Sequence, residues 1–245
     1  MQSHKGGFGM YYHLDYHGGP VSYEWMPSTP LSLIWEQMTQ AYEYGIKDVW
    51  VVNVGDLKGN EVALGYFLAL AYDFEKWGSV APNSCMEYLY EWAKQNFPAA
   101  NPELWKKCVR LYTDFVAINA MRRPETLHAG IYHPCHYRET DNMLRKAEIL
   151  WSLNEEIFMT LSASDKDAYY SMLYYPVKAS LNLLRMQLYA GKNAHYAAQG
   201  RKEANVYGEL VSKCIALDKS LCEEFAAFLG GKWKGMELEK HIGFT

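Results

Sequence analysis

One short segment restricts the fold of this chain more than any other, the nearly continuous apolar run VWVVNV over residues 49–54. Strands buried on both faces have this pattern, which is typical of parallel sheets. A second strand is predicted over residues 9–16, and it ends in polar side chains before the loop at 17–20. The two strands lie about 40 residues apart, which leaves room for one crossover helix between parallel strands. We therefore predict a β-α-β arrangement in the first part of the chain.

A helical pattern follows each predicted strand. Thr29 before Pro30 predicts a helix start, with the threonine as N-cap and the proline in the first turn. Gly45 predicts the end of that helix. After the second strand, apolar residues at helical spacing predict another helix over residues 61–77.

The remainder of the chain has a different pattern. No strand pattern occurs between residues 84 and 230, and amphipathic segments there predict a series of helices. Their expected ranges are 84–97, 102–121, a long helix ending at 161 after a polar connection at 122–137, 164–191 with a kink at Pro176, and 201–229. The fold class is therefore mainly α with a short α/β part, and the larger part is all-α.

Charge and cysteine content argue against several classes of protein. A net charge of −4 provides no basic surplus, so we expect neither nucleic acid nor an anionic membrane surface as the main partner. The 5 cysteines are odd in number and form no CxxC pair, which predicts neither a disulfide framework nor a zinc ribbon. Reduced cysteines slightly favour the cytoplasm, while a periplasmic or secreted location stays open for the full-length protein.

Aromatic residues are abundant, with 20 Tyr and 8 Trp. Two interpretations stay open. Aromatic faces stack on the apolar faces of sugar rings, and they also fill the cores of helical domains. In the second case the helical part could be an interaction or homodimerisation module without catalysis.

Polar side chains lie at the carboxyl ends of both predicted strands, where ligands bind in α/β barrels. They are His13, Asp15 and Tyr16 after the first strand, and Asn53, Asp56 and Lys58 after the second. Histidine and amide groups can hydrogen-bond to hydroxyls, and a lysine or protonated histidine can pair with a carboxylate. A structural role is the alternative, in which Asp56 caps the next helix and Asn53 stabilises the turn.

Short blocks of sequence along the whole chain match one known family. In order they are GGFG at 6–9, YYHLDY at 11–16, GGP at 18–20, IWEQM at 34–38, WVVNVGDLK at 50–58, YPVKAS at 175–180, GGKW at 230–233 and HIG at 241–243. Together they resemble glycoside hydrolase family 115, the xylan α-glucuronidases. The resemblance implies that residues 1–80 are the last βα units of a catalytic (β/α)8 barrel. Residues 81–231 would then be a helical bundle domain, and 232–245 a linker toward a following domain.

The same resemblance implies an enzyme that removes α-1,2-linked glucuronic acid, or its 4-O-methyl ether, from xylan with inversion. Glucuronoxylan, or xylo-oligosaccharides that carry glucuronic acid, would be the substrate. By the motif match, His13, Tyr16 and Asn53 would line the uronic acid pocket, and Asp15, Asp56 and Lys58 lie in the same motifs.

Inverting hydrolysis needs a general acid and a general base with carboxyl groups about 6.5–9.5 Å apart. In the family the favoured carboxylates lie on earlier strands. We therefore expect the acid and base upstream of Met1, and expect the isolated chain to be inactive. No cofactor and no metal is expected.

Two further patterns bear on the site. Lys58 is followed by Gly59 where the family pattern has proline, and this substitution leaves the loop freer. His128, His133, Cys135 and His136 form a histidine-rich segment. Zinc sites usually have four ligands in paired spacings, so a polar connection is the favoured interpretation of this segment.

Overall fold

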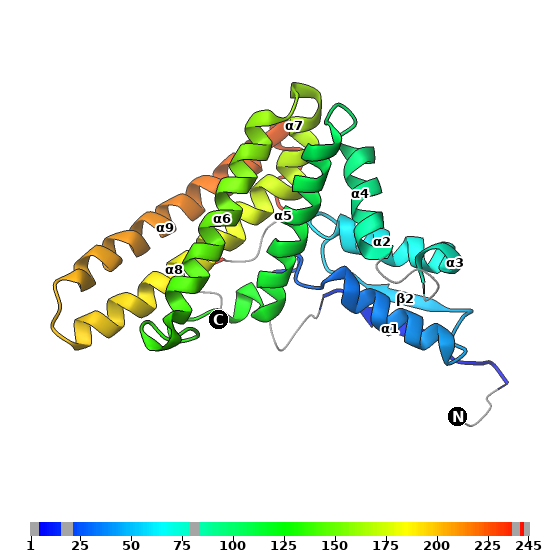
Figure 1. The fold of residues 1–245 in the computed structure, drawn as a ribbon, viewed down its shortest axis with the longest axis horizontal. Helices are drawn as coiled ribbons and strands as arrows, with labels where there is room; N and C mark the ends of the chain where they lie inside the picture. Colours follow the sequence, from blue (N-terminus) through cyan, green and yellow to red (C-terminus); the bar gives the residue numbers. More distant parts are fainter. Residues whose placement is uncertain (1–4, 16–21, 79–83, 237–240, 243–245) are drawn as a thin grey trace. The chain divides into compact units, whose positions relative to one another are not determined.

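The computed structural model describes residues 5–15, 22–78, 84–236 and 241–242 (Figure 1). Contacts divide the chain into two compact units, Met1–Ala120 and Met121–Thr245, which are taken separately below. None of the helices in the described ranges is long and apolar enough to cross a membrane.

The first unit contains a two-stranded parallel sheet, as the apolar run predicts. Strand β1 (Met10–His13) pairs with β2 (Trp50–Asn53), and helix α1 (Leu31–Glu43) lies between them in the sequence. The register places Met10 opposite Trp50 and His13 opposite Asn53. The predicted β-α-β arrangement is therefore confirmed, with strands of 4 residues each.

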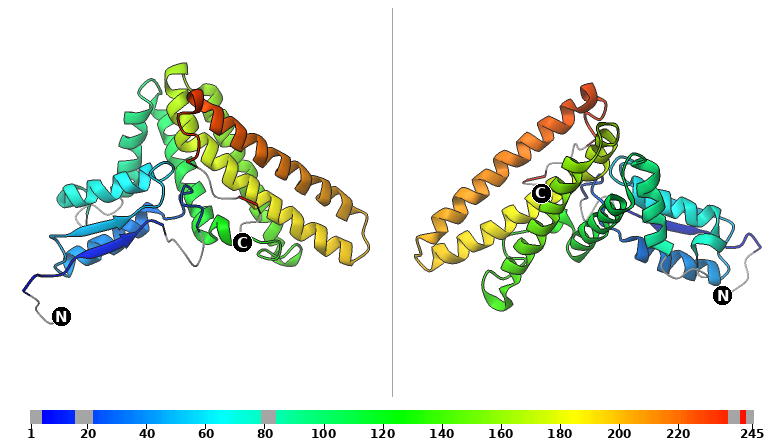
Figure 2. Two further views of the ribbon diagram at one scale, coloured as in Figure 1. Left: turned by 180° about the vertical axis from the view of Figure 1, so that it is seen from behind. Right: turned by 45° about the horizontal axis from the view of Figure 1, so that its top comes forward.

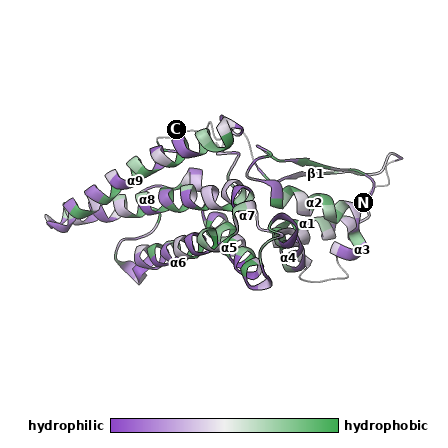
Figure 3. Cartoon of the chain, turned by 90° about the horizontal axis from the view of Figure 1, so that it is seen from above, coloured by the Kyte–Doolittle hydropathy of each residue, from purple (hydrophilic) through white to green (hydrophobic). Residues whose placement is uncertain are grey.

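Helices cover one face of this sheet (Figure 3). Phe67 of α2 (Glu61–Tyr72) stacks on Tyr12 with ring centroids 5.9 Å apart, and lies 6.0 Å from the ring of Trp50. Tyr11 and Val51, which point to the opposite face, are 62% and 49% exposed. The apolar run predicts burial on both faces, but Val51 is exposed and Trp50 and Val52, on the face toward α2, are only partly buried.

Two details around the helices of this unit differ from the sequence prediction. Thr29 does not cap α1, because its hydroxyl donates a hydrogen bond to the carbonyl of Leu14 at 3.0 Å. The helix predicted over 61–77 is divided into α2 and α3 (Phe74–Trp77). Asp73 separates them with a non-helical backbone, and its carboxylate accepts a hydrogen bond from the backbone N–H of Lys76 at 3.1 Å.

Two longer helices complete the first unit, α4 (Ser84–Asn96) and α5 (Pro102–Met121). Asn101 accepts a hydrogen bond from the N–H of Leu104 at 3.0 Å, which stabilises the start of α5. Helix α4 packs on α2 and α3, where the Ser84 hydroxyl donates to the carbonyl of Trp77 at 2.6 Å. By their contacts, nearly all residues of both helices belong to the same compact unit as the sheet. The domain boundary expected near residue 80 stays a prediction.

All the regular secondary structure in the described residues of the second unit is helical. Its main helices are α6 (Glu139–Thr160), α7 (Ala163–Tyr169), α8 (Tyr175–Ala198) and α9 (Glu203–Ala227). Short 3-10 segments are η1 (Pro124–Thr126), η2 (His136–Arg138) and η4 (Phe228–Gly231). Helices α8 and α9 run side by side as an antiparallel pair (Figure 2).

A π-helical turn, η3 (Tyr170–Tyr174), joins α7 to α8 immediately before Pro176. Proline lacks an N–H, and a wide turn accommodates this loss. The predicted kink is therefore a local widening of a continuous helix. Asn154 of α6 supports the turn, because its amide donates to the Tyr174 carbonyl at 3.1 Å and accepts from the Tyr169 hydroxyl at 2.8 Å.

Replacement of Asn154 tests this support. Asn154 is fully buried, so Asn154→Ala removes the acceptor of the hydrogen bond from the Tyr169 hydroxyl and the donor of the bond to the Tyr174 carbonyl. We expect a loss of about 1–3 kcal/mol in the free energy of unfolding, measured by urea denaturation. Asn142→Ala on the exposed face of the same helix is the control, with an expected change below about 0.5 kcal/mol. Equal effects of the two substitutions would contradict this role.

Candidate functional site

The two predicted hydroxyl-binding residues lie next to each other. His13 and Asn53 end the two strands as register partners, and the N–H of Leu14 donates to the carbonyl of Asn53 at 2.8 Å. Alternation along the strands puts both side chains on the face opposite α2, together with Tyr11 and Val51. The rings of Tyr11 and His13 have centroids 4.6 Å apart, as expected for neighbours on one face.

The residues that follow β1 are held differently. Asp15 is 5% exposed, and its carboxylate accepts a hydrogen bond from the Ser22 hydroxyl. Tyr16, predicted to line the same pocket, lies outside the described residues. The structure therefore places Asp15 below the surface, in a position to fix the backbone that carries His13.

The loop after β2 packs on the segment around Glu24. The N–H of Asp56 donates to the Glu24 carbonyl at 3.3 Å, and the Asn60 amide donates to the same carbonyl at 2.6 Å. Asn60 also donates to the carbonyl of Asp56 at 3.0 Å. Asp56 does not cap α2, because the N-cap position belongs to Asn60. The alternative in which Asp56 is a helix cap is therefore wrong.

Lys58 is also fixed within this loop. It is 8% exposed, and its ammonium group pairs with the carboxylate of Glu61. The other oxygen of Glu61 accepts a hydrogen bond from the N–H of Gly59 at 2.8 Å. To pair with the carboxylate of a ligand, Lys58 would have to share or leave Glu61.

The two strands and the residues at their carboxyl ends lie in a part of the chain that matches a known family. The family model for glycosyl hydrolase family 115 matches residues 1–126, just over half of the 245 residues. The chain belongs to glycosyl hydrolase family 115. The match includes both strands and every predicted site residue, and it confirms the family resemblance for the sequence blocks up to residue 58. The blocks at 175–180, 230–233 and 241–243 lie outside the matched residues. Comparison with curated proteins gives no match.

The chain is therefore part of a glycoside hydrolase family, and its predicted site residues can be compared with what a glycosidase needs. A glycosidase of the common type needs carboxyl groups at the scissile bond and hydrogen-bonding groups for the sugar. His13 and Asn53, whose side chains can form hydrogen bonds, end the two strands as register partners. Among the predicted carboxylates, Asp15 is buried against Ser22.

A pocket of about 540 Å³ lies elsewhere in the first unit of this family 115 chain. It lies between α1, α4 and α5, and Trp35, Met86 and Tyr112 are among the residues that line it. Of the predicted site residues that the structure describes, none lines it. The pocket lies among the helices that cover the sheet, so it does not coincide with the strand-end site.

The histidine-rich connection has a local structural role. Nδ1 of His133 accepts hydrogen bonds from the N–H groups of Cys135 at 3.0 Å and His136 at 2.8 Å. The His133 and His136 rings stack with centroids 3.8 Å apart. Sγ of Cys135 lies 3.3 Å from Nε2 of His195 on α8. These contacts form a compact polar turn, in agreement with the interpretation as a polar connection.

Buried thiols in this family 115 chain are poor nucleophiles. Burial raises the pKa of Cys108 to about 12, and burial also raises the pKa values of Cys85 and Cys214. A thiol reacts as its thiolate, so a raised pKa lowers its reactivity. Cys214 is a buried free thiol, whereas Cys222 is a free thiol of intermediate burial.

Proposed function

We propose that this chain forms one wall of a pocket for α-1,2-linked glucuronic acid, or its 4-O-methyl ether, in an enzyme that cleaves it from xylan. The observation that carries the proposal is the pairing of His13 with Asn53 at the carboxyl ends of parallel strands. Both lie on the face opposite to the one on which Phe67 of α2 packs. In a (β/α)8 barrel, helices cover only the outside and ligands bind at the carboxyl ends of the strands. The arrangement supports residues 1–80 as barrel units.

His13 and Asn53 would bind the hydroxyls of the sugar. A neutral imidazole offers one donor and one acceptor, and an amide offers two donors and an acceptor, so the pair can bind adjacent hydroxyls of a pyranose. Tyr16 would complete this wall by the motif match. Lys58 would attract the carboxylate of the uronic acid while it stays close to Glu61.

The acid and base of the reaction would come from other strands of the barrel. Inversion needs two carboxyl groups about 6.5–9.5 Å apart that both reach the glycosidic bond. Asp15 is buried and hydrogen-bonded to Ser22, which suits a positioning role better than proton transfer to a substrate. The carboxylate of Glu61 is paired with Lys58.

Sugar binding tests the pocket. Titration of the chain with glucuronic acid, followed by ligand-observed NMR, is expected to show weak saturable binding. His13→Ala removes a hydrogen-bonding group, which should weaken binding roughly 10-fold, the equivalent of about 1.4 kcal/mol. His128→Ala, an exposed histidine of the second unit, is the matched control and should bind as the unchanged chain does. Unaltered binding by His13→Ala would contradict the proposed pocket.

Hydrolysis tests the location of the acid and base. Incubation of the chain with glucuronoxylan is expected to release no glucuronic acid, as measured by chromatography of the products, because one pocket wall cannot protonate the leaving group. Released glucuronic acid would contradict this division of the site. Asp15→Asn and Asp56→Asn would then identify the carboxylate responsible.

A non-catalytic interaction module, including a homodimer, is the second candidate. The exposed Tyr11 and Val51 on the open face of the sheet favour it, since an apolar sheet face is commonly covered by another surface. Sedimentation analysis would detect a homodimer. Tyr11→Asp would disrupt a dimer formed through this face, whereas a dimer unaffected by this change would use another surface.

A further inference from the structure

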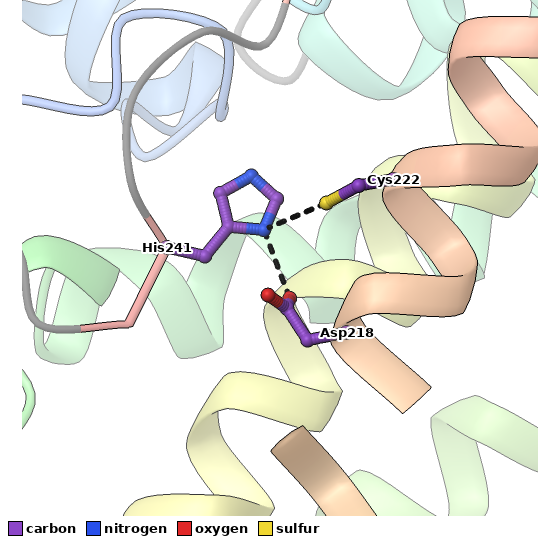
Figure 4. A group of neighbouring side chains, drawn as sticks. All are labelled: Asp218, Cys222 and His241. Atoms are coloured by element: carbon purple, nitrogen blue, oxygen red, sulfur yellow. Dashed lines mark hydrogen bonds and ion pairs between the residues drawn. The ribbon is translucent and has the colours of Figure 1, made fainter. Parts of the chain in front are cut away.

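Three side chains of types that can bind metal ions meet at one point in the second unit, away from His13 and Asn53 (Figure 4). Asp218 and Cys222 lie one turn apart on the same face of α9, and His241 meets them from the C-terminal segment. Nδ1 of His241 is 2.9 Å from Oδ1 of Asp218 and 3.6 Å from Sγ of Cys222. All three ligand atoms lie within 4.8 Å of one another.

The geometry differs from that of a catalytic Cys-His-Asp triad. In such a triad the carboxylate contacts one ring nitrogen and the nucleophile contacts the other. Here both Asp218 and Cys222 contact Nδ1 of His241. Convergence of a thiol and a carboxylate on one ring nitrogen is the arrangement expected of three ligands around a common ion.

We propose that Asp218, Cys222 and His241 bind a divalent transition metal ion, with zinc as the best match to the ligands. Thiolate, imidazole and carboxylate are the three protein ligands that zinc uses. At bond lengths of about 2.0–2.3 Å and tetrahedral angles, the ligand atoms lie about 3.3–3.6 Å apart. The Nδ1–Sγ distance of 3.6 Å already fits, and the Nδ1–Oδ1 distance of 2.9 Å needs an increase of a few tenths of an ångström. A water molecule would fill the fourth position.

The surroundings favour a tightly held ion. The side chains of His241 and Asp218 are only 4% and 12% exposed, which limits competition from water. Asp218 and Cys222 both lie within reach of Nδ1 of His241, which holds the ring toward the point where the three ligand atoms converge.

Metal binding would fasten the C-terminal segment to α9. Cys222 and His241 are 19 positions apart, since 241 − 222 = 19, so the ion closes a short loop that includes η4 (Phe228–Gly231). Closing such a loop restricts the unfolded chain and stabilises the folded one. The bound ion would thus act as a structural cross-link within the second unit.

Metal titration of the reduced, full 245-residue chain tests the site. Cobalt is a spectroscopic substitute for zinc, and we expect one equivalent to bind with a thiolate-to-cobalt charge-transfer band that zinc displaces. Cys222→Ser should remove this band, and Cys222→Ser or Asp218→Asn should weaken zinc binding by at least about 100-fold. Cys214→Ser on the same helix and Cys135→Ser, which removes the thiol beside His195, are the controls and should bind as before.

A second measurement needs no substitution, and it decides the matter if the Cys222 variant does not fold. Zinc should slow the alkylation of Cys222, followed by peptide mass spectrometry, at least 10-fold. Alkylation of Cys85, which is also partly exposed, should stay unchanged. The proposal is overturned if zinc does not bind, if it leaves the alkylation of Cys222 unchanged, or if binding is lost in Cys135→Ser.

Discussion

Replacing Gly59 by alanine is expected to destabilise the chain by roughly 2–6 kcal/mol. Gly59 has φ +97°, where a side chain adds about 1–3 kcal/mol of backbone strain. A Cβ at this position would lie 1.8 Å from the carbonyl oxygen of Trp25, and relief of such an overlap costs about 1–3 kcal/mol more. The Trp25 carbonyl cannot move alone, because the adjacent Glu24 carbonyl accepts from Asp56 and Asn60.

Gly45→Ala is the matched control for this substitution. Gly45 also has a positive φ, +90°, but a Cβ there would meet no atom within 4 Å. Its cost should therefore be the backbone term alone, about 1–2 kcal/mol. Urea denaturation of both variants separates strain from overlap, and equal losses would show that the loop around Trp25 adapts.

Weaker binding of glucuronic acid by Gly59→Ala is also expected, since Gly59 lies in the loop that holds Lys58.

The sheet and its polar edge could be predicted from the sequence because each signal is local. The apolar run around Trp50 marks β2, and the period-2 alternation of β1 assigns Tyr12 and His13 to opposite faces. Parallel strands joined by one crossover helix then bring His13 and Asn53 to the same end of the sheet. Helix starts such as Asn101 were predictable for the same reason, since capping involves only neighbouring residues.

Contacts between distant residues could not be predicted in this way. The hydroxyl of Thr29 bonds to Leu14 in place of its own helix, although its sequence context is that of an N-cap. Gly191 does not end α8, which continues to Ala198. Instead it lets the carbonyl of Ala129 approach, since a Cβ there would be 2.2 Å away.

The cluster of Asp218, Cys222 and His241 illustrates the same limit. Only the spacing of Asp218 and Cys222 on one helix is visible locally, and such a pair is common. The third residue lies 19 positions beyond Cys222 and meets the pair only after the chain has turned at η4.

Phe67→Ala is the substitution that should connect the helical side of the sheet to the sugar site. Phe67 is 2% exposed and contacts Tyr12 of β1 and Trp50 of β2, so it packs behind both strands. Removal of a buried phenylalanine ring costs about 3–5 kcal/mol. We expect a loss of this size in the free energy of unfolding, measured by urea denaturation.

Leu68→Ala is the control, because Leu68 is adjacent on α2 and exposed, and its loss should change stability by less than about 0.5 kcal/mol. Phe67 lies on the opposite face from His13 and Asn53, so it cannot touch a sugar bound there. Weaker glucuronic acid binding by folded Phe67→Ala would therefore come from a loosened strand pair. Unchanged binding would mean that strand hydrogen bonds alone, such as that from Leu14 to Asn53, hold the two side chains in place.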